Sequence, residues 1–128
     1  MMRNRHHGCG CYQERQSRWV EPSILYLLLE KTRHGYELMQ ELPKFGFLVG
    51  PADPGAIYRT LRHLEDVGLV RSEWDTAGTG PAKHQYMITE LGREHLQLWA
   101  NALRKRRNSL DVFIKKLENI NLSSVGNP

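Results

Sequence analysis

The segment from residue 53 to residue 92 constrains the fold most, because its pattern changes from helix to hairpin and back to helix. Asp53 suits a helix N-cap, and Pro54 suits the first helical position, where its missing N–H costs nothing. Gly68 is typical of a helix stop. The apolar positions between these signals repeat at i, i+4 and i+7: Ile57, Leu61 and Leu64. We therefore predict an amphipathic helix over this first part of the segment.

The opposite face of the predicted helix is polar and largely basic: Arg59, Arg62, His63 and Asp66. Such a face, next to the small residues Pro54, Gly55 and Ala56 at the helix start, suits contact with the phosphates and base edges of duplex DNA. The alternative is a solvated face whose arginines pair with nearby acidic residues. Two arginines on the exposed side of this helix favour DNA.

The residues after this helix predict a wing. From Val70 to Asp75 the face of Val70, Ser72 and Trp74 alternates with a charged face, as in a half-buried strand. Residues 75–82 are rich in turn formers, and His84–Ile88 forms the return strand. Thr89 can cap the next helix. A helix, a hairpin and a second helix indicate a winged helix-turn-helix: a mainly α fold with a small β-hairpin.

A long helix over residues 89–120 carries the second strong pattern. Four leucines recur every seventh residue, with Trp99, Phe113 and Ile120 three positions later and Arg106 interrupting. A period of 3.5 predicts a seam between two helices, and about 30 helical residues span roughly 45 Å, which exceeds so small a domain. We expect a homodimer; the alternative is packing on the chain's own domain. The expected interface residues are Leu96, Trp99, Leu103, Leu110, Phe113 and Leu117.

Composition excludes several classes of protein. The chain has 128 residues and a net charge of +4, which favours a polyanionic partner. It has neither a span of about 20 apolar residues nor a hydrophobic signal region, so we expect no membrane partner. Two cysteines only two residues apart cannot stabilise the fold by a disulfide, which suggests a reducing, cytoplasmic setting. No nucleophile–base set, carboxylate pair or phosphate loop indicates an enzyme.

We divide the chain into four parts. Residues 1–20 form an extension that we expect to be flexible, residues 21–90 the winged-helix domain, residues 91–121 a dimerisation helix, and residues 122–128 a tail. Pro22 should start the first helix of the domain, and Gly35 and Tyr36 should set the start of the second. The expected buried stripe of the first helix is Ile24, Leu25, Leu28 and Leu29.

Three motifs resemble the PadR family of bacterial transcriptional regulators: Gly35-Tyr36-Glu37-Leu38, the run from Pro54-Gly55-Ala56-Ile57-Tyr58 to Leu69-Val70, and Tyr86-Met87-Ile88-Thr89-Glu90-Leu91-Gly92. The resemblance covers roughly residues 20–118. It implies a winged-helix homodimer that binds operator DNA and is usually released by a small effector. It also implies DNA contacts around Tyr58. The family's wing commonly carries arginine where this chain has Lys83 and His84, which we expect to make the wing contact.

The resemblance also suggests an effector site. Related regulators stack flat hydrophobic or aromatic compounds between aromatic residues near the dimer centre, and Trp99 is the candidate here. The tryptophan of some multidrug-binding relatives lies about one turn further on, where this chain has Leu103. The alternative is that Trp99 simply fills the dimer core.

The N-terminal extension holds a separate cluster of His6, His7, Cys9 and Cys11. Imidazole and thiolate are good ligands for zinc, copper or iron, so a metal- or thiol-responsive regulator is an alternative function. The spacing matches no common zinc pattern, and the cluster could equally be an ordinary tail. We expect no required cofactor. A winged-helix module that binds only proteins is a further alternative.

Overall fold

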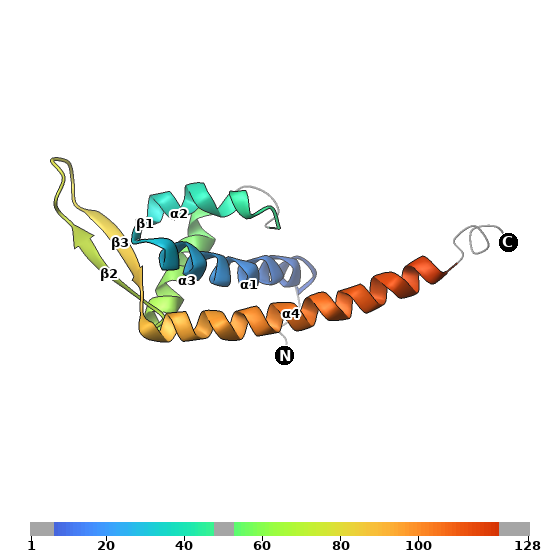
Figure 1. Cartoon of the computed structure of the whole chain (residues 1–128). Coiled ribbons are helices and arrows are strands. Elements are labelled where there is room, and N and C mark those ends of the chain that lie inside the picture. Colours follow the sequence, from blue (N-terminus) through green and yellow to red (C-terminus); the bar gives the residue numbers. More distant parts are fainter. Residues whose placement is uncertain (1–6, 48–52, 121–128) are drawn as a thin grey trace. The chain divides into compact units, whose positions relative to one another are not determined.

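The structure, a computed structural model, describes residues 7–47 and 53–120, with side chains from residue 19 onward. The chain divides into two compact units, residues 1–96 and residues 97–128, and the last helix runs from the first unit into the second. The elements in chain order are α1 (His7–Glu30), β1 (Arg33–His34), α2 (Gly35–Glu41), the 3-10 helix η1 (Leu42–Phe45), α3 (Pro54–Asp66), β2 (Val70–Asp75), β3 (Lys83–Ile88) and α4 (Glu90–Asn119) (Figure 1). No helix in the described part of the chain is long and apolar enough to cross a membrane.

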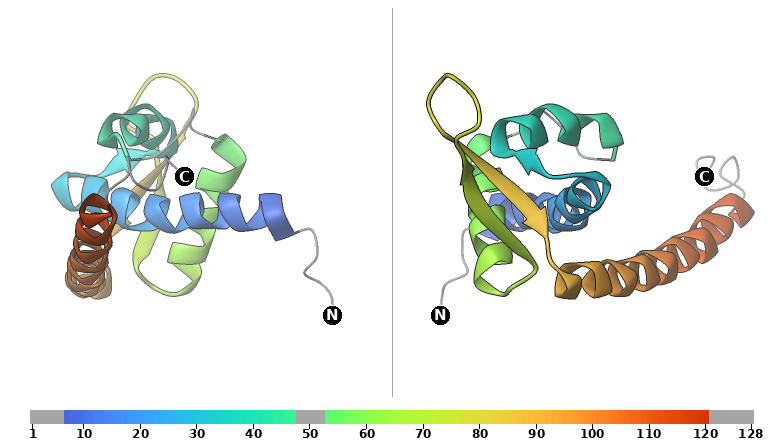
Figure 2. Two further views of the ribbon diagram at one scale, coloured as in Figure 1. Left: turned by 90° about the vertical axis from the view of Figure 1, so that its right-hand side faces the viewer. Right: turned by 60° about the vertical axis from the view of Figure 1, so that its left-hand side comes forward.

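The predicted fold class is confirmed, with one strand added. The three strands are antiparallel in the order β1-β3-β2, and the loop between β2 and β3 extends beyond the helices (Figure 2). Val70 pairs with Ile88 at the base of the hairpin, and Trp74 pairs with His84 near its tip. Strand β1 could not be predicted from the sequence, because a strand of two residues, Arg33 and His34, is too short to show a period.

The core of the first unit is formed where α1 packs against α3, β3, α2 and η1. We expected Leu29 in the buried stripe of α1, but it is 40% exposed, and Leu27 is buried in its place. The physical reason is that α1 is covered on several sides, so its buried arc is centred on Ile24 and Leu28, and Leu29 lies at the edge of that arc. The largest fully buried side chains among the described residues are Ile24, Leu25, Leu38, Leu42, Leu61, Leu64 and Val70.

The expected start of the first helix at Pro22 is wrong. Helix α1 begins at His7, so much of the segment expected as a flexible extension is helical, and Pro22 lies inside the helix. Residues 13–18 include glutamine, glutamate and arginine, which favour helix, and no glycine or proline interrupts residues 12–21. Beside Pro22, the Ser23 hydroxyl donates to the carbonyl oxygen of Trp19 at 2.8 Å.

Gly68 ends α3, as the sequence predicts. Its φ of +83° is in the left-handed region that favours glycine. The Gly68 amide donates to the Glu65 carbonyl at 3.1 Å, and the Leu69 amide donates to the Leu64 carbonyl at 2.8 Å. These two bonds satisfy carbonyls that the helix leaves without partners, and they turn the chain directly into β2.

The start of α4 crosses this same turn. The Thr89 amide donates to the Leu69 carbonyl at 3.1 Å, and the Thr89 hydroxyl donates to the Gly68 carbonyl at 2.6 Å while accepting from the Gly92 amide at 3.1 Å. Thr89 therefore caps α4, as predicted. A Cβ on Gly92 would overlap the Leu69 carbonyl oxygen and the Ile88 side chain, so only glycine permits this crossing.

We predict that Gly92→Ala destabilises the protein by about 1–3 kcal/mol, the usual cost of forcing an extra methyl group into a packed site. The matched control is Gly80→Ala in the wing loop, where an added Cβ would meet nothing within 4 Å. Urea unfolding of both variants measures the difference. Equal midpoints for Gly92→Ala and Gly80→Ala would contradict the close crossing.

Candidate DNA-binding surface

Helix α3 presents the basic face that the sequence predicts. Its apolar residues Ile57, Leu61 and Leu64 are at most 2% exposed and hold the helix against the core. Arg59, Arg62 and His63 are exposed on the other side. The helix is thus fixed by its apolar side and free to contact a partner with its basic side.

Asp53 caps the start of α3, as the sequence predicts. Its Oδ1 accepts the Gly55 amide at 3.1 Å. Since Pro54 has no N–H, Ala56 offers the remaining amide of the three small residues. A Cβ on Gly55 would lie 3.3 Å from Nη1 of Arg59, so that guanidinium lies beside the helix start. The helix start therefore has the Arg59 guanidinium beside it as well as the Ala56 amide.

Tyr58 joins α3 to α2. A Cβ on Gly35 would lie 2.8 Å from the Tyr58 hydroxyl oxygen, so the absence of a side chain at Gly35 lets the phenol ring approach the first turn of α2. The side chain of Tyr58 is still 39% exposed. Gly35 therefore has the structural role that we expected, and Tyr58 lies at the edge of the basic face.

The inner face of the wing is tied to α3 by hydrogen bonds. Ser72 donates its hydroxyl to Oε2 of Glu65 on α3 at 2.7 Å. His84 contacts the Ser72 hydroxyl oxygen through Nε2 at 2.9 Å and the Tyr86 hydroxyl through Nδ1 at 3.2 Å. Because the Ser72 proton goes to the carboxylate, the Ser72 oxygen accepts from Nε2–H of His84.

Tyr86 anchors this network in the protein interior. Its side chain is 4% exposed, and burial raises the pKa of its hydroxyl; the nearby charge of Glu65 contributes, while Arg62 acts in the opposite direction. The hydrogen bonds therefore run from a buried phenol, through the wing, to the helix that carries Arg62.

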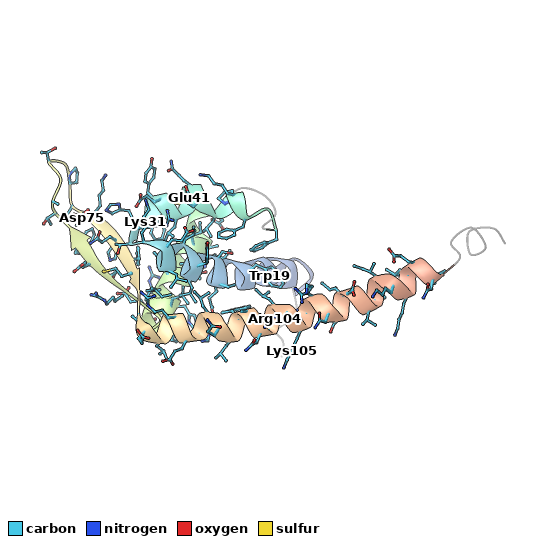
Figure 3. The ribbon with its side chains drawn as sticks, viewed as in Figure 1. Trp19, Lys31, Glu41, Asp75, Arg104 and Lys105 are labelled. Carbon is cyan, nitrogen blue, oxygen red and sulfur yellow. The ribbon has the colours of Figure 1, made fainter. Side chains whose placement is uncertain are left out.

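The outer face of the wing has its own histidine. His34 on β1 contacts Oδ2 of Asp75 through Nε2 at 3.0 Å and Oε1 of Glu37 through Nδ1 at 3.2 Å. Asp75 belongs to the outer part of the hairpin (Figure 3). The His34 amide also donates to Glu37 at 2.8 Å. A contact between residues far apart in the sequence thus holds the wing against the start of α2.

Both carboxylates of this contact are stabilised in their charged form. The backbone N–H of Ala77 lowers the pKa of Asp75, and the side chain of His34 lowers it further. The backbone N–H of His34 lowers the pKa of Glu37. Each group therefore holds its proton less tightly in the folded protein than in the unfolded chain.

We predict that the contact between the wing and α2 loses stability as the pH falls. Ordinary pKa values are about 3.9 for Asp and about 4.3 for Glu, so the folded protein gains stability from these groups above that range and loses it as the pH falls through the lowered values. The double variant Asp75→Asn, Glu37→Gln should melt below the wild type at pH about 6, and the gap should close towards pH about 3. A gap that stays constant over this range would contradict the assignment.

The predicted site residues occupy two parts of one unit. Tyr58, Arg59, Arg62 and His63 lie on α3, while Lys83 and His84 lie at the start of β3, with Lys83 exposed. His84, expected to touch DNA directly, has both ring nitrogens bonded to protein groups. Sequence reasoning placed Trp74 in a half-buried strand, but its side chain is 64% exposed.

The proposed metal cluster cannot be placed in the same way. His6 and the side chains of His7, Cys9 and Cys11 lie outside the described residues. Among the residues that the structure does describe, no group of three or more His, Cys, Asp or Glu side chains is arranged to hold a metal ion.

A helix-turn-helix of α2 and α3, followed by a hairpin joined to the second helix, defines a winged helix protein. Its exposed basic helix and anchored wing are features of a regulator that acts on nucleic acid. The chain belongs to the PadR-like family of transcriptional regulators, whose family model matches residues 24–98.

Two relatives in sequence extend across most of the chain. A transcriptional regulator of Mycobacterium tuberculosis is 37% identical over 84 residues, which cover 66% of this chain and 75% of that protein. An uncharacterised protein of Lysinibacillus sphaericus is 27% identical over 99 residues, which cover 77% of this chain and 91% of that protein.

Solved structures show the same fold. A putative transcriptional regulator of Thermoplasma acidophilum matches with a TM-score of 0.67 and 29% identity, over 77% of this chain and 93% of that one. Bacillus subtilis PadR, solved in complex with operator DNA, matches with a TM-score of 0.55 and 26% identity, over 62% of this chain and 45% of that one.

Proposed function

We propose that this protein is a transcriptional repressor that binds operator DNA as a homodimer in the cytoplasm and is released by a flat hydrophobic or aromatic effector. The observation that carries the proposal is the exposed basic face of α3 on a helix whose other side is fully buried. The operator complex of the similar Bacillus subtilis PadR supports DNA as the partner.

Within this proposal, Arg59 and Arg62 contact phosphates or guanine edges, and Tyr58 and His63 flank them. An arginine that pairs with a guanine distinguishes one base pair from another, whereas a phosphate contact mainly adds affinity. Lys83 on the wing supplies a phosphate contact. The net charge of +4 favours the approach of this surface to DNA.

We predict that Arg62→Ala weakens binding to an operator by about 1–3 kcal/mol, as expected for the loss of a base-reading arginine. The control is Arg93→Ala, which removes an exposed arginine on α4. A gel-shift titration on the DNA upstream of the protein's own gene compares both with the wild type. Equal affinity of the two variants would mean that this face of α3 does not read the operator.

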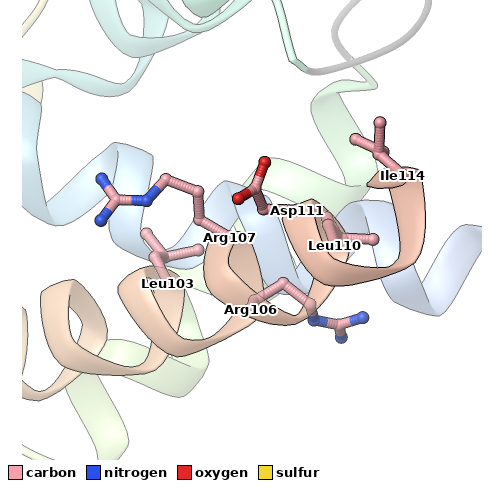
Figure 4. A pocket seen from close by; sticks show the side chains of 6 residues that line it. All are labelled: Leu103, Arg106, Arg107, Leu110, Asp111 and Ile114. Atoms are coloured by element: carbon pink, nitrogen blue, oxygen red, sulfur yellow. The ribbon is translucent and has the colours of Figure 1, made fainter. Parts of the chain in front are cut away.

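The second unit supports the homodimer. On α4, Leu110 is 49% exposed, Phe113 55% and Leu117 43%, so the leucine seam predicted from the sequence is not buried by its own unit. Side chains on successive turns also form a recess (Figure 4), whose lining residues are Leu103, Arg106, Arg107, Leu110, Asp111 and Ile114. A stripe with period 3.5 and recesses between its side chains suits a second helix that inserts its own apolar residues.

We predict that Leu110→Asp gives monomers and abolishes operator binding, because the seam would bury a charge without a partner. Leu110 is exposed within one chain, so the variant should still fold. Asn108→Asp adds the same charge two residues away, on the other side of the helix, and should leave the assembly intact. Sedimentation measures both; a wild type that is already monomeric at micromolar concentration would contradict the dimer.

The effector is proposed to bind at Trp99. This residue lies on the seam between Leu96 and Leu103, so the ring of its symmetry mate would face it in a dimer. Two facing indoles suit a flat aromatic compound. Repeating the gel-shift titration with candidate aromatic ligands tests this part of the proposal.

A further inference from the structure

Trp74 has an exposed aromatic surface that the fold does not use. Its indole stacks on the His84 ring with centroids 4.6 Å apart and planes 15° apart, yet 64% of the residue is exposed. We propose that Trp74 is a DNA-contacting residue of the wing, which packs its free face against the sugar–phosphate backbone of the duplex, and that His84 is its positioning residue. The inference rests on the proposed operator binding and names the wing's contact.

The position of Trp74 on the sheet supports this contact. In the hairpin, Val70 pairs with Ile88, Ser72 with Tyr86 and Trp74 with His84. Alternate residues of a strand share a face, so Trp74 continues the face that is bonded to Glu65 on α3. The indole therefore lies on the side of the wing that faces the recognition helix.

His84 holds the indole in a fixed place. The His84 ring is stacked on Trp74 and packs against Tyr86, with centroids 4.8 Å apart. Its nitrogens are bonded to Tyr86 and Ser72, and Ser72 is bonded to Glu65. Glu65 is three residues from Arg62, on a neighbouring position of the same helix surface. The contacts of Trp74 thus lead, through hydrogen bonds, to the helix that carries the arginine proposed to read the operator.

The net charge of the wing strands also supports an aromatic contact with DNA. The strands of the wing carry two basic residues, Arg71 and Lys83, and two acidic ones, Glu73 and Asp75. Their charges cancel, so ion pairing with phosphates gives the wing little net attraction to DNA. An aromatic ring with one N–H donor can pack on deoxyribose and donate to a phosphate without adding charge. Trp74 thus adds to the phosphate contact of Lys83 a contact that does not depend on the wing's net charge.

The test uses the full-length protein and a duplex selected on it from a random-sequence library. Trp74→Ala should weaken binding on the order of tenfold, the scale of one aromatic contact with a nucleotide, without changing the slope of log K against log salt. Lys83→Ala should instead reduce that slope by about one. Val67→Ala, which trims an exposed apolar side chain at the end of α3, is the matched control and should bind as the wild type does.

A double-mutant cycle tests the positioning role. His84→Ala should weaken binding in the wild type but should add little when Trp74 is already alanine, because the histidine acts through the indole. A role of His84 in stability alone would give equal losses in both backgrounds. Thermal melting of each variant confirms that the comparison is made between folded proteins.

The outcomes separate this inference from the proposed function. If Arg62→Ala weakens binding while Trp74→Ala binds as the wild type does, α3 reads DNA and the inference about Trp74 is overturned. A slope that changes with Trp74→Ala would also overturn it, since the contact would then be ionic in effect. If the wild type selects no duplex at all, the proposed function and this inference both fail, and Trp74 is left as a surface for a protein partner.

Discussion

The backbone contact between Leu69 and the start of α4 is the constraint on which the arrangement of the first unit depends. One carbonyl group accepts the Thr89 amide, and the missing side chain of Gly92 leaves room for it. At this point α3 has just ended, β2 begins, β3 ends and α4 starts. The direction of the wing and the first turn of α4 are therefore both set relative to the recognition helix by a few backbone atoms.

The wing needs further support because its outer part extends beyond the core. A two-stranded hairpin is only marginally stable by itself in water. Here one histidine serves each face: His84 links the inner face to α3 through Ser72, and His34 links Asp75 on the outer face to the start of α2. The outer contact depends on two carboxylates whose pKa values are lowered in the folded protein, so acid should loosen the outer face.

The sequence predicted those parts of the molecule that follow from local pattern. The bounds of α3, the hairpin and α4 agree with capping residues, alternation and periodicity, and the basic face of α3 follows from the same period. It failed for two elements, for different reasons. Strand β1 exists because Arg33 and His34 meet β3, and a strand of two residues has no signature in a short window of sequence. The early start of α1 does have a local signature, the helix-forming residues before Pro22, but Pro22 also suits a first helical position and so predicted a later start.

The exposure of Trp74 could not be predicted from the local pattern either. Alternation along β2 correctly assigned it to the face of Val70, but it cannot tell how far along the strand the core extends. Val70 is buried, and four residues later the same face is open, so the tryptophan appears on the surface next to a histidine that is fully bonded. The proposed ionic contacts of α3 with DNA weaken as salt rises, whereas the proposed packing of the indole does not. A regulator with both kinds of contact keeps part of its hold on DNA when its ionic contacts are screened.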